Sequence, residues 1–262
     1  MHARRLYAHR GASAELPENT MAAFERAVAH GVDALEMDVH LTRDEHLIVI
    51  HDDTGARTTG VPARWPETDL AEVRRLDAGW GFIAPDGTRP FAGKRLAIPT
   101  FEEVLEAFPG MRINVDLKGD RTVEIMLALL RKHRAEDRVT LASFQLRTLV
   151  RARRLGFGGE TALSQGEVAT LLGLPAVLWR QLPLTGMAAQ VPVAAGRIRF
   201  DRATFIAKCH SIGLRVDFWT IDDRSDAERL LGLGADGIMT NDPSAVRSLF
   251  APPGSAAGRA SS

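Results

Sequence analysis

Two carboxylates occupy alternate positions in the stretch Asp33–Leu41, which reads DALEMDVHL. Successive side chains of a β-strand point to opposite faces, so Glu36 and Asp38 would share one face while Leu35 and Met37 occupy the other. The apolar face suits packing against helices. The acidic face needs a chemical reason, because an unpaired buried carboxylate is costly.

A second stretch, RINVDLK at 112–118, has the same alternation and places Asn114, Asp116 and Lys118 on one face. If both stretches belong to one barrel, three carboxylates and one lysine point into the same space. Lys118 can neutralise only one acid, so a divalent cation would balance the rest. Oxygen ligands favour Ca²⁺ or Mg²⁺ over zinc. The alternative is an internal ion-pair network without metal.

Two histidines end apolar runs, His9 in YAHRG and His51 in HLIVIHDD. Barrel enzymes carry catalytic groups at the C-terminal tips of their strands. A pair of histidines can supply the base and the acid of a phosphoryl transfer at neutral pH. Arg10 can bind a phosphate with its planar guanidinium. In the motif PENT, Asn19 or Thr20 is expected to cap the first helix.

Short apolar runs alternate along the chain with amphipathic helical stretches, and these elements position the residues above. Such alternation is typical of a parallel sheet with crossover helices. Eight β-then-α units in this length favour a (β/α)₈ barrel over an open sheet. Thr100 and Glu103 form a capping box at the start of one helix. The predicted strands are Leu6–His9, Ala34–His40, Arg112–Lys118, Arg138–Ser143, Glu160–Ser164, Ala188–Val193, Leu214–Thr220 and Asp236–Thr240.

The segment between His51 and Pro99 breaks this rhythm, because it is rich in glycine, proline and turn dipeptides and has one short helical piece. A long insertion after a barrel strand would lie over the C-terminal rim. We expect it to form a cap that faces the substrate; the alternative is a plain surface loop. The expected organisation is one domain over residues 1–250, with a cap subdomain at 53–98 inside it and a disordered tail at 251–262.

Composition excludes some classes of function. The 262 residues contain 33 Lys plus Arg and 33 Asp plus Glu, so no basic excess points to nucleic acid or to an acidic membrane surface. Cys209 is the single cysteine, which excludes a disulfide within this sequence and fits a reducing compartment. We find neither an apolar signal segment nor a run long enough to span a bilayer. A cytoplasmic location is therefore expected, and the oligomeric state stays open.

Taken together, these segments resemble the glycerophosphodiester phosphodiesterase family. The resemblance rests on the combination of HRG, PENT, the E-x-D of LEMD and the HD of IHDD, followed by LDAGW, NVDLKGD, VDFWTID and GIMTNDP. These motifs run in the family's order from Tyr7 to about Pro243, which covers nearly the whole chain.

The resemblance implies a (β/α)₈ barrel that uses one divalent ion to hydrolyse glycerophosphodiesters to glycerol phosphate and an alcohol. By matching motifs it implies that Glu36, Asp38 and Asp116 bind the metal and that His9 and His51 are the catalytic pair. It also implies that Arg10 and Lys118 bind the phosphate. Asn19 would support the site, and Trp219 would form a wall of the pocket. The insertion matches a small extra domain of the family.

Three positions depart from the family's pattern. Asp116 stands where glutamate is frequent, Asp222 where asparagine is frequent, and Asn241 where aspartate is common. Asp116 is one methylene shorter than glutamate, which would favour a less direct metal contact. The other two positions concern the rim of the site.

Two alternative functions remain from the sequence. A phospholipase-D-type hydrolase of lysophospholipids would use the same headgroup chemistry. The apolar window VATLLGLPAVLW would then be a lipid-facing edge, but packing as a buried helix is the favoured interpretation of this window. A barrel that has lost catalysis would only bind phosphodiesters, but such a protein has no need for two histidines placed as acid and base. A small-molecule partner is expected in either case.

Overall fold

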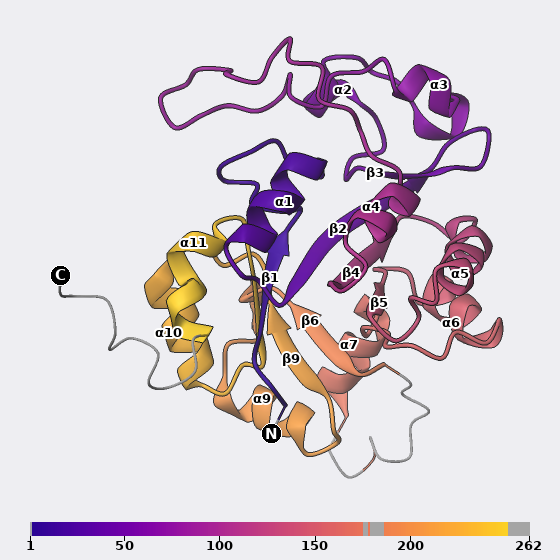
Figure 1. Ribbon diagram of the computed structural model, residues 1–262. Coiled ribbons are helices and arrows are strands. Elements are labelled where there is room, and N and C mark those ends of the chain that lie inside the picture. The colour runs from indigo at the N-terminus through magenta and orange to yellow at the C-terminus, as the bar shows by residue number, and fades with distance from the viewer. Residues whose placement is uncertain (1, 175–177, 179–185, 251–262) are drawn as a thin grey trace.

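The computed structural model describes residues 2–174, 178 and 186–250, and it shows a curved parallel sheet surrounded by helices (Figure 1). Neighbouring strands of the sheet follow the order β5-β4-β2-β1-β10-β9-β6, and every pairing in this series is parallel. The strands are β1 (Arg5–His9), β2 (Ala34–Leu41), β4 (Arg112–Leu117), β5 (Val139–Ala142), β6 (Ala188–Val191), β9 (Arg215–Phe218) and β10 (Gly237–Thr240).

A short extended segment closes the sheet between β5 and β6. Thr161 forms a parallel bridge to Leu141 of β5, and Ala162 forms one to Ala188 of β6. These bridges fall within the predicted strand Glu160–Ser164, which takes the place of the eighth parallel strand of the barrel. The predicted (β/α)₈ barrel is confirmed.

Helices cover the outside of the barrel, and their apolar faces pack on the outward residues of the strands in one large core. The first helix begins at Thr20, whose hydroxyl accepts a hydrogen bond from the amide of Ala23 at 3.3 Å. The main helices are α1 (Met21–Ala29), α4 (Phe101–Ala107), α5 (Thr122–Lys132), α6 (Leu146–Arg154), α7 (Gln165–Gly173), α9 (Ala203–His210), α10 (Arg224–Gly232) and α11 (Pro243–Val246), the last followed by the 3₁₀ turn η2 (Arg247–Phe250).

The strand β3 (Leu47–Val49) pairs antiparallel with β2, with Val49 opposite Val39. The apolar run that ends in His51 is therefore a β segment, as expected, but it is not one of the parallel strands of the barrel. The chain instead leaves β2, turns, and runs back along it, so that Ile50 donates to the carbonyl of Asp38 at 2.9 Å. This return brings His51 back to the mouth of the barrel.

The inserted segment forms its own small layer, drawn in purple above α1 and β3 in Figure 1. It contains α2 (Ala56–Thr59), the 3₁₀ helix η1 (Trp65–Glu67) and α3 (Leu70–Val73). Together with Ile48 of β3 and Ile50, its apolar side chains form a second core, separate from the main one, around the fully buried Trp65. The boundaries 1–250 and 53–98 stay predictions, and the expected tail at 251–262 lies outside the described residues.

Charged side chains fill the barrel at the end opposite its mouth. Arg215 contacts Asp217 at 3.0 Å, Glu160 at 3.3 Å and the hydroxyl of Tyr7 at 2.9 Å. Burial raises the pKa of Glu160, but hydrogen bonds from Arg5 and the charge of Arg215 outweigh it and bring the pKa to about 2. This end of the barrel is thus closed by an ion-pair network.

Two hairpin strands, β7 (Ala194–Ala195) and β8 (Ile198–Arg199), extend from the barrel after β6. Cys209 lies fully buried on α9, as expected for a small apolar side chain, and burial raises the pKa of its thiol to about 12. Among the described residues, none of the helices has the length and apolar character needed to cross a bilayer.

Candidate active site

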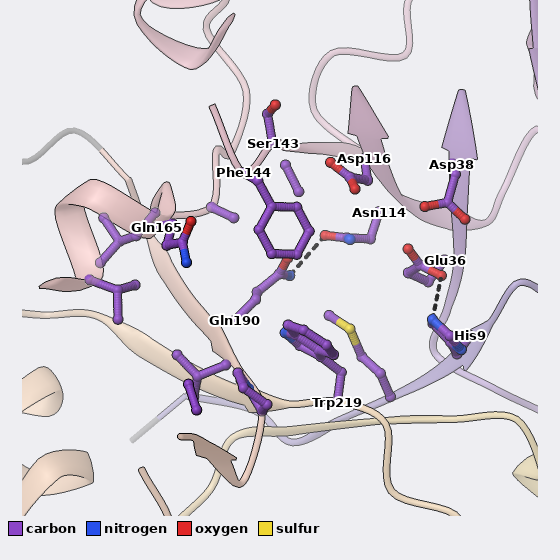
Figure 2. A pocket seen from close by; sticks show the side chains of 18 of the residues that line it. His9, Glu36, Asp38, Asn114, Asp116, Ser143, Phe144, Gln165, Gln190 and Trp219 are labelled. Carbon is purple, nitrogen blue, oxygen red and sulfur yellow. Dashed lines mark hydrogen bonds and ion pairs between the residues drawn. The ribbon is translucent and has the colours of Figure 1, made fainter. Parts of the chain in front are cut away.

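The strand register brings the candidate residues into two adjacent layers of the barrel. His9 of β1 lies opposite Glu36 of β2, and Glu36 lies opposite Asn114 of β4. One layer nearer the C-terminal ends, Asp38 lies opposite Asp116. Figure 2 shows these side chains converging on one pocket, as the period-two pattern predicts.

The pocket has a volume of about 380 Å³ and two chemically different ends. Histidines, carboxylates, Arg10 and Lys118 line one end, and apolar side chains line the other. Trp219 stands between them and packs edge-on against Phe144, with ring centroids 6.1 Å apart. Gln190 donates to Asn114 at 2.8 Å on the pocket floor.

Lys118 and Arg10 balance much of the acidic charge. The Lys118 ammonium lies 2.8 Å from Asp38 and 2.6 Å from Asp116, and the Arg10 Nε lies 3.3 Å from Asp38. Burial raises the pKa of Asp38, but the charges of Lys118 and Arg10 outweigh it, so the pKa lies below its usual value. Asp38 is therefore ionised, and Lys118 bridges two acids instead of one.

Glu36 and Asp116 lack full compensation. Burial and the charge of Asp38 hold the pKa of Glu36 well above its usual range. Burial also raises the pKa of Asp116, whose Oδ1 is buried without a hydrogen-bond partner. The Oδ1 of Asn19 is likewise buried without a partner, while its Nδ2 donates to Asp38 at 3.3 Å. These free oxygens suit a hard divalent cation.

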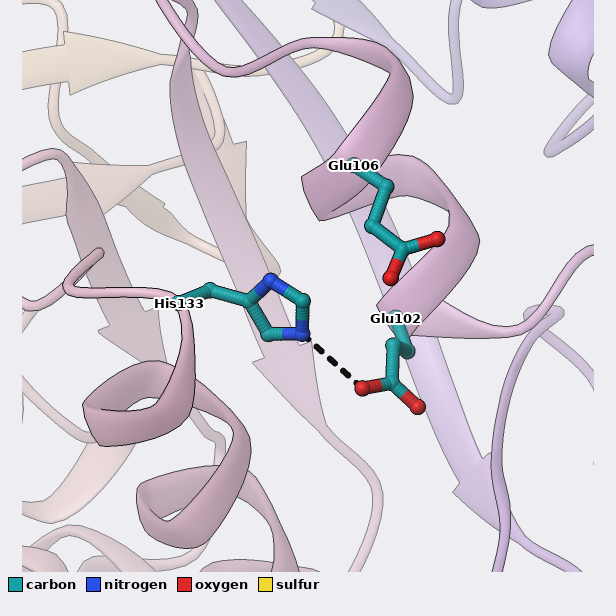
Figure 3. A group of neighbouring side chains, drawn as sticks. All are labelled: Glu102, Glu106 and His133. Carbon is teal, nitrogen blue, oxygen red and sulfur yellow. Dashed lines mark hydrogen bonds and ion pairs between the residues drawn. The ribbon is translucent and has the colours of Figure 1, made fainter.

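The carboxylates of Glu36, Asp38 and Asp116 do not bring one oxygen each within 4.8 Å of one another. Among the described residues, only Glu102, Glu106 and His133 bring ligand atoms all within 4.8 Å of one another (Figure 3). That group lies on α4 and at the end of α5, and hydrogen bonds from Lys132 at 2.7 Å and His133 at 2.9 Å already hold the carboxylate of Glu102. Its contacts are those of a surface ion-pair cluster.

His9 is held by a neutral partner. Its Nδ1 donates to the Oδ1 of Asn241 at 2.7 Å, and the Nδ2 of Asn241 donates to Asp222 at 2.8 Å. Its Nε2 lies 4.0 Å from Glu36 and is left as an acceptor. Burial and the nearby charge of Arg10 lower the pKa of His9, so the ring is neutral at neutral pH.

His51 is held by an acidic partner. Its Nδ1 donates to Asp52 at 2.7 Å, and its carbonyl accepts from the Nε2 of His40 at 2.9 Å. Hydrogen bonds from Arg57 hold the pKa of Asp52 far below its usual value. The second nitrogen of His51 remains for chemistry in the pocket.

All of the predicted site residues except Asn19 line the pocket, and Asn19 supports Asp38 from behind. The sequence did not identify Asn241 and Asp52 as partners of the histidines. An acid directly after His51 was a local signal for Asp52. Asn241 had no such signal, because 232 positions separate it from His9.

Comparisons with known proteins agree with this geometry. The model of the glycerophosphoryl diester phosphodiesterase family matches residues 9–245. A glycerophosphodiester phosphodiesterase of Caldanaerobacter subterraneus subsp. tengcongensis is 31% identical over 92% of this chain and 96% of its own. A mouse protein named lysophospholipase D GDPD1 is 27% identical over 91% of this chain and 83% of its own.

A solved structure gives the same fold. An Oleispira antarctica phosphodiesterase, in complex with the product sn-glycerol-3-phosphate, superimposes with a TM-score of 0.78 at 26% identity. The match covers 94% of this chain and 96% of that one.

Proposed function

Because the chain belongs to the glycerophosphoryl diester phosphodiesterase family, we propose that its barrel pocket hydrolyses glycerophosphodiesters by His9 and His51 with one divalent cation. The chain is an enzyme of the glycerophosphodiester phosphodiesterase class, which speaks against the alternative of a barrel that only binds. The observation that carries the proposal is the convergence of two separately held histidines on three carboxylates in one pocket.

Glu36, Asp38 and Asp116 are the residues that would hold Ca²⁺ or Mg²⁺, and Lys118 would have to give up part of its contact with them. A bound ion would place positive charge beside the phosphate oxygens, where attack on phosphorus builds negative charge. Arg10 and Lys118 donate to the same oxygens and orient the diester. Trp219 forms the wall beside the glycerol.

The two histidines have separable roles in this proposal. His9 is neutral with its Nε2 free, so it accepts a proton from the attacking hydroxyl. That hydroxyl is either water, which gives glycerol phosphate directly, or the neighbouring glycerol hydroxyl, which gives a cyclic phosphate that water then opens. His51, with Nδ1 bound to Asp52, delivers a proton from Nε2 to the leaving alkoxide. The products are glycerol phosphate and an alcohol.

Release of choline from glycerophosphocholine tests this proposal. We expect turnover that stops in EDTA and returns with Ca²⁺ or Mg²⁺, and a loss of about 10²- to 10⁴-fold in kcat for His9→Ala and for His51→Ala. His46→Ala, which changes a half-exposed histidine on the turn after β2, is the matched control and should keep full activity.

Turnover that survives complete chelation would remove the ion from the proposal, and an active His9→Ala enzyme would remove that residue from the mechanism. Asp116→Asn should raise the ion concentration needed for activity, whereas Glu102→Gln should leave it unchanged. The reverse result would move the ion to the group on α4 and α5.

The apolar end of the pocket favours lysophospholipids as a second substrate class. Leu172 of α7, Ile198 of β8 and Phe144 line this end and are 37%, 47% and 56% exposed. A lysophospholipid carries one hydrocarbon chain on the glycerol, and such a wall can bury it. The name of the mouse relative supports the same class.

Ile198→Asp separates the two substrates. We expect it to lower kcat/KM for lysophosphatidylcholine by about tenfold, because a charge opposes burial of the chain. Glycerophosphocholine should be hydrolysed as before. Equal effects on both substrates, or no turnover of the lysolipid by the unchanged enzyme, would exclude this second candidate.

The single cysteine supports a cytoplasmic setting, which stays a prediction.

A further inference from the structure

The inserted segment does not form a wall of the pocket. Among the described residues that line the pocket, none lies between Asp53 and Ile98. The expected role of this segment, a cap in contact with substrate, therefore has no lining residue to support it. The segment contacts the site at a different place, behind the catalytic groups.

That contact is made by Arg57, on α2 of the inserted segment. Its guanidinium donates to Glu18 at 2.7 and 2.8 Å and to Asp52 at 2.7 and 3.0 Å. Arginine presents five donors in a rigid plane, so one side chain can bind two carboxylates at once. Lysine offers a single charged point and cannot make the same four contacts.

Each of these carboxylates holds a residue of the proposed mechanism. Asp52 accepts from the Nδ1 of His51 at 2.7 Å. Glu18, from the PENT turn, accepts from the Nη1 of Arg10 at 3.0 Å. Arg57 thus lies one side chain behind both the proposed acid and a phosphate-binding residue, and it touches neither of them.

The surrounding segment fixes Arg57 in this place. The indole of Trp65 donates to the carbonyl of Asp52 at 2.6 Å, which joins the second core to the backbone beside His51. Gly81 approaches α2 so closely that its amide donates to the carbonyl of Thr58 at 2.8 Å. The segment is therefore a packed support for α2 and its arginine.

We propose that Arg57 is a positioning residue, through which the inserted segment orients His51 and Arg10 for hydrolysis. This inference rests on the proposed function, because it assigns Arg57 to the chemistry of those two residues. Without Arg57, Asp52 and Glu18 lose a charged donor each and can turn toward solvent. The imidazole and the guanidinium that they hold then sample unproductive orientations.

The test compares steady-state kinetics on glycerophosphocholine with thermal unfolding. We expect Arg57→Ala to lower kcat by about 10- to 100-fold, less than the loss of a whole acid–base group. Arg57→Lys should recover part of this loss, because one charge can bind one of the two carboxylates. The matched control is Arg43→Ala, which removes a bidentate contact, at 2.7 and 2.5 Å, between the turn after β2 and Asp69 of the inserted segment. It should leave kcat unchanged.

A double-mutant cycle separates positioning from a general loss of structure. Because Asp52 is one of the two carboxylates through which Arg57 acts, the double variant Asp52→Asn with Arg57→Ala should lose less kcat than the product of the two single losses. Losses that multiply would overturn the inference. If Arg57→Ala lowers the melting temperature more than Arg43→Ala does, its loss of kcat no longer separates positioning from a loss of structure. Arg57→Lys then decides between them: a lower kcat at an unchanged melting temperature supports positioning, and an unchanged kcat contradicts it.

The possible failures are distinguishable. If the unchanged enzyme hydrolyses no glycerophosphodiester, the proposed function fails and the inference with it. If the unchanged enzyme is active, and Arg57→Ala keeps its kcat within about twofold, the inference alone is overturned.

Discussion

At the scale of single residues, His9 is held by two side chains at which this sequence departs from the pattern of its family, Asn241 and Asp222. His9 donates to the amide oxygen of Asn241, and the carboxylate sits one step further away, on Asp222. The family that the sequence resembles commonly has the aspartate at 241 and the asparagine at 222. Because Asn241 and Asp222 contact each other, the two departures fall on one hydrogen-bonded pair, and we interpret them as one compensated exchange.

The exchange gives a first prediction. Asn241→Asp would set a second carboxylate against that of Asp222, so we expect kcat to fall by about tenfold and the melting temperature to drop, through like-charge repulsion. Adding Asp222→Asn restores an amide–carboxylate pair and should return kcat to within about threefold of the starting enzyme. Kinetics of the two single variants and the double variant check this. Independent, additive losses would contradict the coupling.

At the scale of elements, the alternation of polar and apolar residues was enough to place the carboxylates. A strand has a period of two, so Glu36 and Asp38 had to share a face, and the same holds for Asn114 and Asp116. The capping box of Thr100 and Glu103 is also confirmed, because both of its hydrogen bonds are local.

The return of the chain along β2 could not be predicted in this way. The turn from Thr42 to His46 contains neither glycine nor asparagine, and Glu45 takes the left-handed conformation at φ 63°. The usual signal for a hairpin was therefore absent. The sequence thus placed His51 after a β segment, but it did not show that this segment runs antiparallel to β2.

The close packing of α2 gives a second prediction. A Cβ added at Gly81 would lie 2.2 Å from the carbonyl oxygen of Arg57, which forces the backbone of α2 to move. We expect Gly81→Ala to cost about 1–3 kcal/mol in the free energy of unfolding and to lower kcat about tenfold. Denaturant unfolding and steady-state kinetics measure the two effects.

Gly110→Ala is the control for this prediction, because a Cβ there meets nothing within 4 Å. It should change neither quantity by more than a small amount. A Gly81→Ala enzyme with lower stability and unchanged kcat would show that the position of α2 does not matter to the chemistry.

At the scale of the whole molecule, the two halves of the barrel contribute different parts of the pocket. The proposed metal ligands and catalytic histidines come from the first 118 residues, and the apolar end of the pocket comes mostly from later elements, among them α7 and β8. The sequence predicted the first half well, because its motifs are compact. It did not predict contacts such as those of His9 with Asn241, which depend on closing the barrel.

The ion-pair network at the far end of the barrel gives a third prediction, on acid stability. The pKa of Glu160 falls from 4.5 to about 2 on folding, so its contribution is present above pH 4.5 and is lost as the pH falls toward 2. The contribution is at most about 3 kcal/mol. We expect Glu160→Gln to destabilise the protein at pH 7 and to flatten the loss of unfolding free energy between pH 5 and pH 2.5. Equal slopes for both proteins would contradict this.

Cys209 lies at the other extreme of reactivity from the open pocket. A thiol with no exposed surface and a pKa of about 12 reacts with an alkylating reagent only when α9 separates from the barrel wall. Because this is the single cysteine, the labelling rate of the unaltered chain measures how often its C-terminal half opens. Turnover, measured in the same tube, would report on the integrity of the N-terminal half at the same moment.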